Sequence, residues 1–159
     1  MITCEALKKC LAYNPITGCF RWLVTTGRAK VGIIAGCLHH EGYRLIKINW
    51  RKYPAHWLAF LYMKGRWPKS QMDHINGLRA DNRWKNLREA TNKLNSENRR
   101  RANRNNGSKL LGAYRYPGGW RSAIGSNGKI YQLGCFRTAK QAHQAYVRAK
   151  RKLHAGCTL

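Results

Sequence analysis

Apolar and polar positions repeat with two periods in the first part of the chain, and each period predicts its own kind of element. Leu7 and Leu11 share one face of a short helix over residues 3–12, and Thr3 stands where a helix cap is favoured. Alternation of apolar and polar residues, bounded by Gly-rich turns, predicts three strands, over residues 19–24, 32–36 and 43–48.

A second amphipathic helix is predicted to begin at Pro54 and to end at Gly65, because proline suits the first helical turn and glycine suits the residue after the last one. Its apolar residues recur at spacings of three and four, which is typical of a face packed on a core. They are Trp57, Leu58, Leu61 and Tyr62. A polar helix rich in Arg and Asn is expected further on, ending in the run 99–104.

The pattern changes after residues 105–108, where Asn-Asn-Gly-Ser has the composition of a linker. Three short strands are predicted over residues 111–116, 120–125 and 130–136. Thr138 and Gln141 then have the spacing of a capping box for a last amphipathic helix. The expected fold class is α+β, ending in a three-stranded antiparallel sheet packed on one helix.

Composition points to a polyanionic partner. The 159 residues include 31 Lys and Arg but only 6 Asp and Glu, a formal net charge of +25. Such repulsion destabilises a compact fold unless a polyanion neutralises it, so nucleic acid is the first partner to consider. No apolar run approaches the roughly 18 residues of a membrane span, and no leader pattern opens the chain. We therefore expect no membrane association and a cytoplasmic location, in a bacterial or phage-infected cell.

The few acidic residues are concentrated, and this favours chemistry over simple coating of nucleic acid. Four of the six lie between positions 73 and 97: Asp73, Asp81, Glu89 and Glu97. Carboxylates repel phosphate, but a metal-dependent phosphodiesterase needs an oxygen anion to hold a cation beside the scissile phosphate. A basic structural protein that coats RNA has no such need.

The six cysteines form no Cys-x-x-Cys pair, and we interpret them as reduced thiols. Cysteine and histidine cluster in the sequence only in the run Cys37-Leu38-His39-His40, and this run lacks the second ligand pair of a zinc site. No zinc is expected.

The segment from Asp73 to Asn95 carries the candidate chemistry. It contains Asp73-His74-Ile75-Asn76-Gly77, then Asp81-Asn82-Arg83, Asn86-Leu87-Arg88 and Thr91-x-x-x-Asn95. We expect a strand ending in the Asp-His pair, a polar loop, and a second strand that leads into a helix. A carboxylate there can hold a cation while the adjacent imidazole takes a proton from water.

These residues resemble the HNH nuclease family, whose fold is a two-strand, one-helix metal finger, here over residues 71–104 of a domain spanning 1–104. The resemblance implies that Asp73 and Asn95 are metal ligands, that His74 is the general base, and that Asn86 holds the loop. Asn95 stands in place of the final His of the motif, as in phage homing-type members, which favours Mg²⁺, with Mn²⁺ as an alternative. Upstream pieces of residues 13–22, 42–44 and 55–58 also match that group.

Residues 110–159, after a linker at 105–109, resemble the ethylene-response-factor (APETALA-type) DNA-binding domain. The matching residues are Gly112, Trp120, Ile124, the Leu133-Gly134-x-Phe136 run and the segment from Ala142 to Tyr146. The resemblance implies that the sheet contacts the major groove of DNA. Its expected reading face consists of Tyr114, Arg115, Arg121, Lys129 and Tyr131.

Further basic residues are expected to bind phosphates: Arg83, Arg99, Arg100, Arg101 and Arg104. For the arginine run the alternative is a solvated basic face. His56, at the start of a helix, is either structural or close to the scissile strand. Trp120 either packs under the last helix or touches the DNA backbone.

The sequence thus predicts a metal-dependent endonuclease of double-stranded DNA, of the homing or phage-encoded type. One active site cuts one strand, so a monomer would nick and a homodimer would make double-strand breaks. The alternative is a non-catalytic DNA-binding regulator built on the same scaffold.

Overall fold

The computed structural model describes residues 1–27 and 29–159, which form two compact units, Met1–Thr91 and Asn92–Leu159. Each unit combines helices with small antiparallel sheets, so the α+β class is confirmed at that level. Among the described residues, no helix has both the length and the apolar character required to cross a membrane.

The first unit begins with helix α1 (Cys4–Cys10), whose N-terminus is capped by the Thr3 hydroxyl accepting from the amide of Ala6. The helix ends earlier than predicted, because Leu11 takes an extended conformation and begins strand β1 (Leu11–Asn14). Leu11 and Tyr13 both point into the core from this strand, which a helix could not achieve at a spacing of two. Strand β1 pairs antiparallel with β2 (Cys19–Trp22).

A second sheet has the order β3-β4-β5, with β3 at Cys37–Leu38, β4 at Arg44–Ile48 and β5 at Arg51–Pro54. The strand predicted over residues 32–36 was wrong. Only an isolated bridge between Ile34 and Arg21 forms there, and Gly36 turns the chain with a φ of 83°. Strand β5 was not predicted, because its Arg-Lys-Tyr-Pro sequence lacks apolar alternation.

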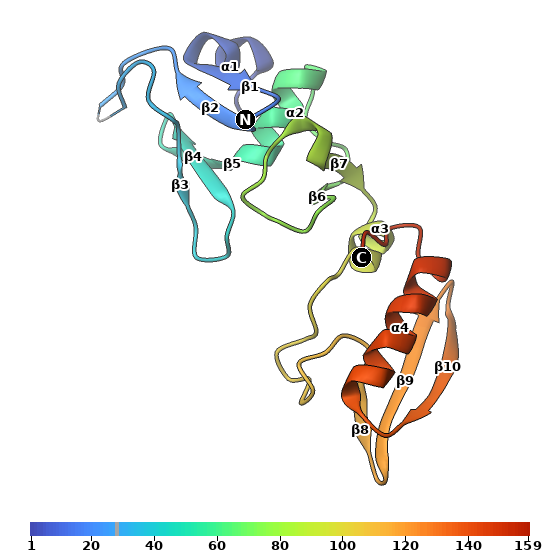
Figure 1. The fold of residues 1–159 in the computed structure, drawn as a ribbon. Helices are drawn as coiled ribbons and strands as arrows, with labels where there is room; N and C mark the ends of the chain where they lie inside the picture. The colour runs from blue at the N-terminus through green and yellow to red at the C-terminus, as the bar shows by residue number, and fades with distance from the viewer. Residues whose placement is uncertain (28) are drawn as a thin grey trace. The chain divides into compact units, whose positions relative to one another are not determined.

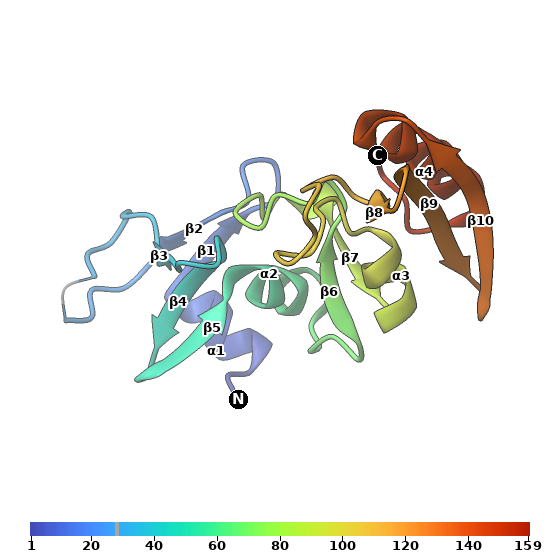
Figure 2. The same ribbon diagram turned by 90° about the horizontal axis from the view of Figure 1, so that it is seen from below.

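Helix α2 (Ala55–Lys64) is confirmed, with Pro54 before it and Gly65 after it at a φ of 71°. It packs against α1, β4 and β5, as the views in Figures 1 and 2 show. Apolar residues from all these elements form one core, whose most deeply buried members are Leu7, Leu11, Phe20, Ile46, Leu58 and Leu61. A hairpin of β6 (Gln71–His74) and β7 (Leu87–Ala90) completes the unit, with the short 3₁₀ helix η1 (Trp84–Asn86) before β7.

The second unit begins with helix α3 (Asn92–Glu97), which stops well before the predicted end in the run 99–104. Its sheet has the order β10-β9-β8, with β8 at Tyr114–Tyr116, β9 at Gly119–Ser126 and β10 at Lys129–Phe136. Helix α4 (Ala139–Leu153) lies along one face of the sheet (Figure 1). Both hydrogen bonds of the Thr138–Gln141 capping box form, so this part of the prediction is confirmed.

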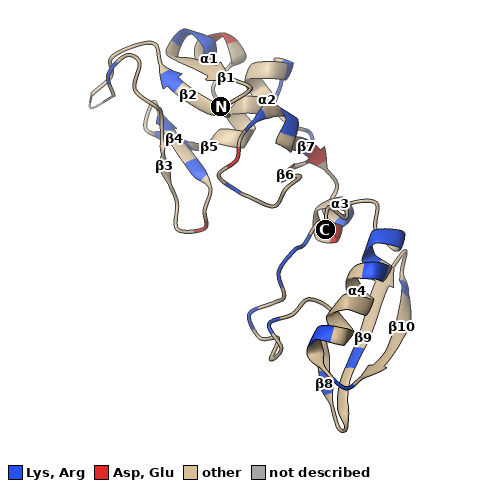
Figure 3. Cartoon of the chain, in the orientation of Figure 1, with Lys and Arg blue, Asp and Glu red and all other residues tan. Residues whose placement is uncertain are grey.

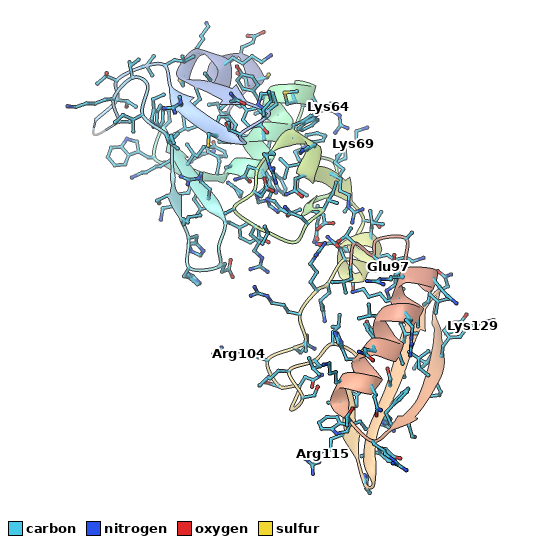
Figure 4. All side chains as sticks on the ribbon, viewed as in Figure 1. Lys64, Lys69, Glu97, Arg104, Arg115 and Lys129 are labelled. Atoms are coloured by element: carbon cyan, nitrogen blue, oxygen red, sulfur yellow. The ribbon has the colours of Figure 1, made fainter. Side chains whose placement is uncertain are left out.

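The boundary between the units falls at Thr91, earlier than the linker expected at 105–109. Hydrogen bonds tie residues 93–100 to the C-terminal part of the chain. Glu97, labelled in Figure 4, accepts from the amide of Gly156 at 3.0 Å, and Lys93 donates to the side chain of Asn127 at 2.6 Å. Helix α3, which carries Asn95, is therefore part of the sheet-and-helix unit.

Gly156 leaves no room for a larger side chain where the C-terminal segment meets α3. A Cβ there would lie 2.4 Å from the carbonyl oxygen of Leu94 and 2.9 Å from the Cβ of Glu97. We expect Gly156→Ala to destabilise the second unit by about 1–3 kcal/mol, the usual cost of overpacking. Thermal unfolding measures this loss. Gly107→Ala is the matched control, because no atom lies within 4 Å of the added Cβ, and its melting temperature should be unchanged or higher.

Candidate active site

The β6–β7 hairpin places Asp73 and His74 side by side at the end of a strand. Asp73 pairs with Arg88 across the hairpin, and His74 pairs with Leu87. Adjacent strand residues point to opposite faces, yet the side chains of both residues are buried, at 7% and 5% exposure. The strand end is thus covered on both faces, one of them by the polar loop that follows.

The carboxylate of Asp73 has a cationic neighbour. Its Oδ2 accepts from Arg88 Nε at 3.0 Å and from Arg88 Nη2 at 2.8 Å. This is a largely buried pair, in which the guanidinium compensates the burial of the acid.

The loop between β6 and β7 is held by the side chain of Asn86, which is 6% exposed. Its Oδ1 accepts from the amide of Asn76 at 2.9 Å, and its Nδ2 donates to the carbonyl of Asp81 at 2.7 Å. The side chain of Asn76 in turn donates to Asp81 Oδ2 at 2.7 Å. One carboxamide therefore joins the beginning, the middle and the end of the loop.

Arg83 is engaged within the same loop. Its Nε donates to Asp81 Oδ1 at 2.7 Å, and Nη2 donates to the second oxygen. These bonds lower the pKa of Asp81 to about 2, so the carboxylate is charged at neutral pH. The side chain of Arg83 is 42% exposed, so it can contact a phosphate while its hydrogen bonds to Asp81 remain in place.

Asn82 fixes the ring of His74. Its Oδ1, an acceptor, lies 3.3 Å from His74 Nε2, so in the neutral ring this nitrogen carries the proton and Nδ1 carries the lone pair. Asn82 is 2% exposed, and its carbonyl accepts from the hydroxyl of Tyr13 at 2.6 Å. The turn before β2 supports the same backbone, because a Cβ on Gly18 would lie 2.4 Å from the amide nitrogen of Arg83.

Burial lowers the pKa of His74, against opposing contributions from its bond to Asn82 and from the charges of Asp73 and Asp81. The imidazole is neutral at pH 7. Two further rings surround it: His56 at 4.8 Å and Tyr43 at 6.0 Å between ring centroids. His56 Nδ1 is buried and has no hydrogen-bond partner among the described residues. The sequence left two possibilities for His56, a structural role or a place close to the scissile strand. In the structure its ring lies against that of the candidate base, His74.

Asn95 lies half-buried on α3, in the second unit, whereas Asp73, His74 and Asn86 share the β6–β7 hairpin of the first unit. Lys and Arg residues are spread over both units, and acidic residues are rare in either (Figure 3). Within the arginine run, Arg101 and Arg104 are exposed. Arg100 is instead used inside the protein, since it donates to the carbonyl and the hydroxyl of Thr158.

The five residues expected on one reading face are divided by the register of the sheet. Tyr114 and Arg121 are cross-strand partners and share the face that carries no helix. The other three pair with residues of the face that packs on α4: Arg115 with Trp120, Lys129 with Ser126, and Tyr131 with Ile124. The register therefore divides the five residues into two sets, and their role in DNA binding stays a prediction. Arg115 and Lys129, both labelled in Figure 4, remain exposed.

Sequence reasoning missed three residues that shape the site. The pairing of Arg88 with Asp73 follows from the register, which sequence does not specify. Tyr13 lies far from the motif in sequence and reaches it only through the fold. Asn82 belongs to the predicted motif, but its contact with the ring of His74 was not predicted. The run Asp81-Asn82-Arg83 was the available signal.

Comparison with known families supports part of the resemblance. A family model described as HNH endonuclease matches residues 53–97, from β5 through α3, which includes every residue of the motif from Asp73 to Asn95. This segment suggests a nuclease that acts on DNA. The match does not extend into the three-stranded sheet, so the ethylene-response-factor resemblance stays a prediction. No curated protein and no solved structure gives a significant match.

Removing the side chain of Asn86 should loosen the loop. We expect Asn86→Ala to lower the free energy of unfolding by about 1–3 kcal/mol, because it leaves the amide of Asn76 and the carbonyl of Asp81 without this partner. Urea unfolding measures the change. Asn105→Ala is the control, at an exposed position outside the loop, and should stay within about 0.5 kcal/mol of the wild type. Equal stability of the two variants would contradict the role assigned to Asn86.

His56 predicts a dependence of stability on pH. Burial, with a smaller contribution from His74, lowers the pKa of His56 from 6.5 to about 3. Between these values the unfolded chain binds a proton that the folded chain does not, so stability falls as pH falls, by at most about 1.4 kcal/mol per pH unit for this one group. Urea unfolding between about pH 7 and pH 4 should show a shallower decline for His56→Gln than for the wild type. Identical slopes would argue against a neutral, buried His56.

Proposed function

We propose that the protein is a metal-dependent endonuclease that hydrolyses phosphodiester bonds in double-stranded DNA. The observation that carries the proposal is the buried Asp73–His74 pair, with the ring of His74 oriented by Asn82, inside a segment that matches HNH endonucleases. The net charge of +25 supports a polyanionic substrate.

The chemistry of the proposed donors suits a hard divalent cation. The described residues contain no group of three or more His, Cys, Asp and Glu side chains that could hold a metal. Mg²⁺ needs no such cage, since it keeps several waters and is commonly held by one or two protein carboxylates together with substrate phosphates. Asp73 would supply the carboxylate, shared with Arg88. By the resemblance to HNH nucleases, Asn95 of α3 would add an amide oxygen. Mn²⁺ suits the same donors.

His74 is the proposed general base. Its Nδ1 would take the proton from the attacking water, while the contact of Nε2 with Asn82 Oδ1 keeps the ring in the required tautomer. The same contact would stabilise the imidazolium that forms, together with the charges of Asp73 and Asp81. When bound, the cation would supply charge stabilisation for the phosphorane-like transition state and the leaving oxygen.

Asn82 and Asn86 act in this scheme as positioning residues. Asn82 sets the ring of His74, and Asn86 keeps the loop closed so that Asn82 stays in place. With one such site per chain, a monomer would cut one strand, and a homodimer would be needed for concerted double-strand breaks.

One observation favours a second function, that of a non-catalytic DNA-binding regulator. Arg88 already compensates the charge of Asp73, so the hairpin is stable as a scaffold without a cation. A regulator would bind DNA equally well with and without divalent ions and would cut none.

Single substitutions distinguish the two functions. We expect His74→Ala to slow cleavage of supercoiled plasmid by about 10²–10⁴-fold in Mg²⁺, because general-base catalysis has that magnitude, with little change in DNA affinity. Asp73→Asn should abolish metal-dependent cutting. His40→Ala is the control, since His40 is an exposed histidine outside the hairpin, and it should cut like the wild type. Plasmid left intact by the wild-type protein in both Mg²⁺ and Mn²⁺ would favour the regulator instead.

A further inference from the structure

The turn between β4 and β5 has an unusual residue at its tip. Asn49 and Trp50 connect the two strands, and both have positive φ values, 46° and 65°. A two-residue hairpin turn with positive φ at both positions favours Asn followed by Gly. A bulky aromatic residue is strained in this conformation, at a cost of the order of 1 kcal/mol, so Trp50 weakens the turn in which it sits.

Trp50 also gains almost no burial in return. It is 88% exposed, and the contact that its ring makes is with Lys47, whose Nζ lies 4.3 Å from the ring centroid. Tryptophan has the largest apolar surface of the side chains, and leaving it in water forgoes the stabilisation that burial would bring.

The charges beside the turn are unfavourable as well. Lys47 and Lys52 are direct cross-strand partners, and like charges in that position destabilise a sheet. Arg51 follows Trp50 at once and is exposed. No ion pair or side-chain hydrogen bond between described residues involves Lys47, Arg51 or Lys52.

We propose that this hairpin tip, formed by Lys47, Trp50, Arg51 and Lys52, is a second DNA contact of the protein, separate from the β6–β7 hairpin. The indole of Trp50 stacks against bases at a base step, and the three cations bind the flanking phosphates. Strained backbone, an exposed aromatic ring and opposed like charges all cost stability in the free protein. A partner that offers both aromatic faces and closely spaced negative charge compensates all three.

DNA is the partner of this surface because it combines aromatic base faces with closely spaced negative charge. This choice of partner rests on the proposed function. An acidic protein would supply the charge without a regular array of aromatic faces. An anionic membrane would supply charge and apolar depth, so vesicles of phosphatidylglycerol serve as the competing partner in the test.

The decisive variant is Trp50→Gly, because glycine suits the left-handed turn. We expect an equal or higher melting temperature together with an affinity for a DNA duplex that is weaker by about five- to one-hundredfold at fixed salt, the range for loss of one base–aromatic stack. Trp50→Phe should keep most of the affinity. Ile16→Ala, at another turn with 80% exposure, is the control and should bind like the wild type.

A charge variant gives an independent measurement. Lys52→Glu places opposite charges across the strands, so the melting temperature should rise slightly while DNA affinity falls and its salt dependence becomes shallower. Lys9→Glu changes the net charge equally on α1, where Lys9 is exposed, and should weaken binding less.

The outcomes separate this inference from the proposed function. A wild-type protein that binds and cuts DNA while Trp50→Gly binds it equally well would overturn the inference and leave the nuclease proposal intact. Loss of vesicle binding with unchanged DNA binding would also overturn it, in favour of a membrane contact. A wild-type protein with no affinity for duplex DNA would overturn both.

Discussion

The two hydrogen bonds of the Asn86 carboxamide hold the polar loop after β6 in a closed shape, and the candidate site depends on that shape. They join the amide of Asn76 to the carbonyl of Asp81, which places the next residue, Asn82, against the ring of His74. The hydroxyl of Tyr13 secures Asn82 from the opposite side. The contact with Asn82 thereby gives the imidazole a fixed tautomer, while burial keeps its pKa low against the raising effects of that contact and of the charges of Asp73 and Asp81.

The excess of positive charge serves more than one purpose. Arg88 compensates a buried carboxylate, Arg83 holds Asp81, and Arg100 binds the C-terminal segment, so these guanidiniums are largely structural. Exposed cations such as Arg101, Arg104 and Lys52 have no such internal role among the described contacts and are the ones suited to phosphates. Charge counting alone does not separate these groups, because the difference lies in which acid or carbonyl each guanidinium meets.

Local signals predicted the elements whose causes are local. The capping box of α4 and the Pro and Gly at the two ends of α2 act within a few residues, and both helices were predicted correctly. The end of α1 was not, because Leu11 is extended in order to bury its side chain against distant residues. Helix α3 is short and belongs to the second unit through the bond between Glu97 and Gly156, which are far apart in sequence. In the site, the residue types of Asp73 and His74 were enough to predict their chemistry. Their partners were not predicted, because the contact of Arg88 depends on the strand register and that of Asn82 on the conformation of the loop.

The central claim is that the loop presents His74 as a neutral base with its proton on Nε2. Long-range ¹H–¹⁵N correlation spectra of the histidine rings at about pH 7 test it directly, with the His74 signals assigned by their absence in His74→Ala. The account predicts an uncharged ring protonated on Nε2. A ring protonated on Nδ1 alone, or an imidazolium at that pH, would contradict it.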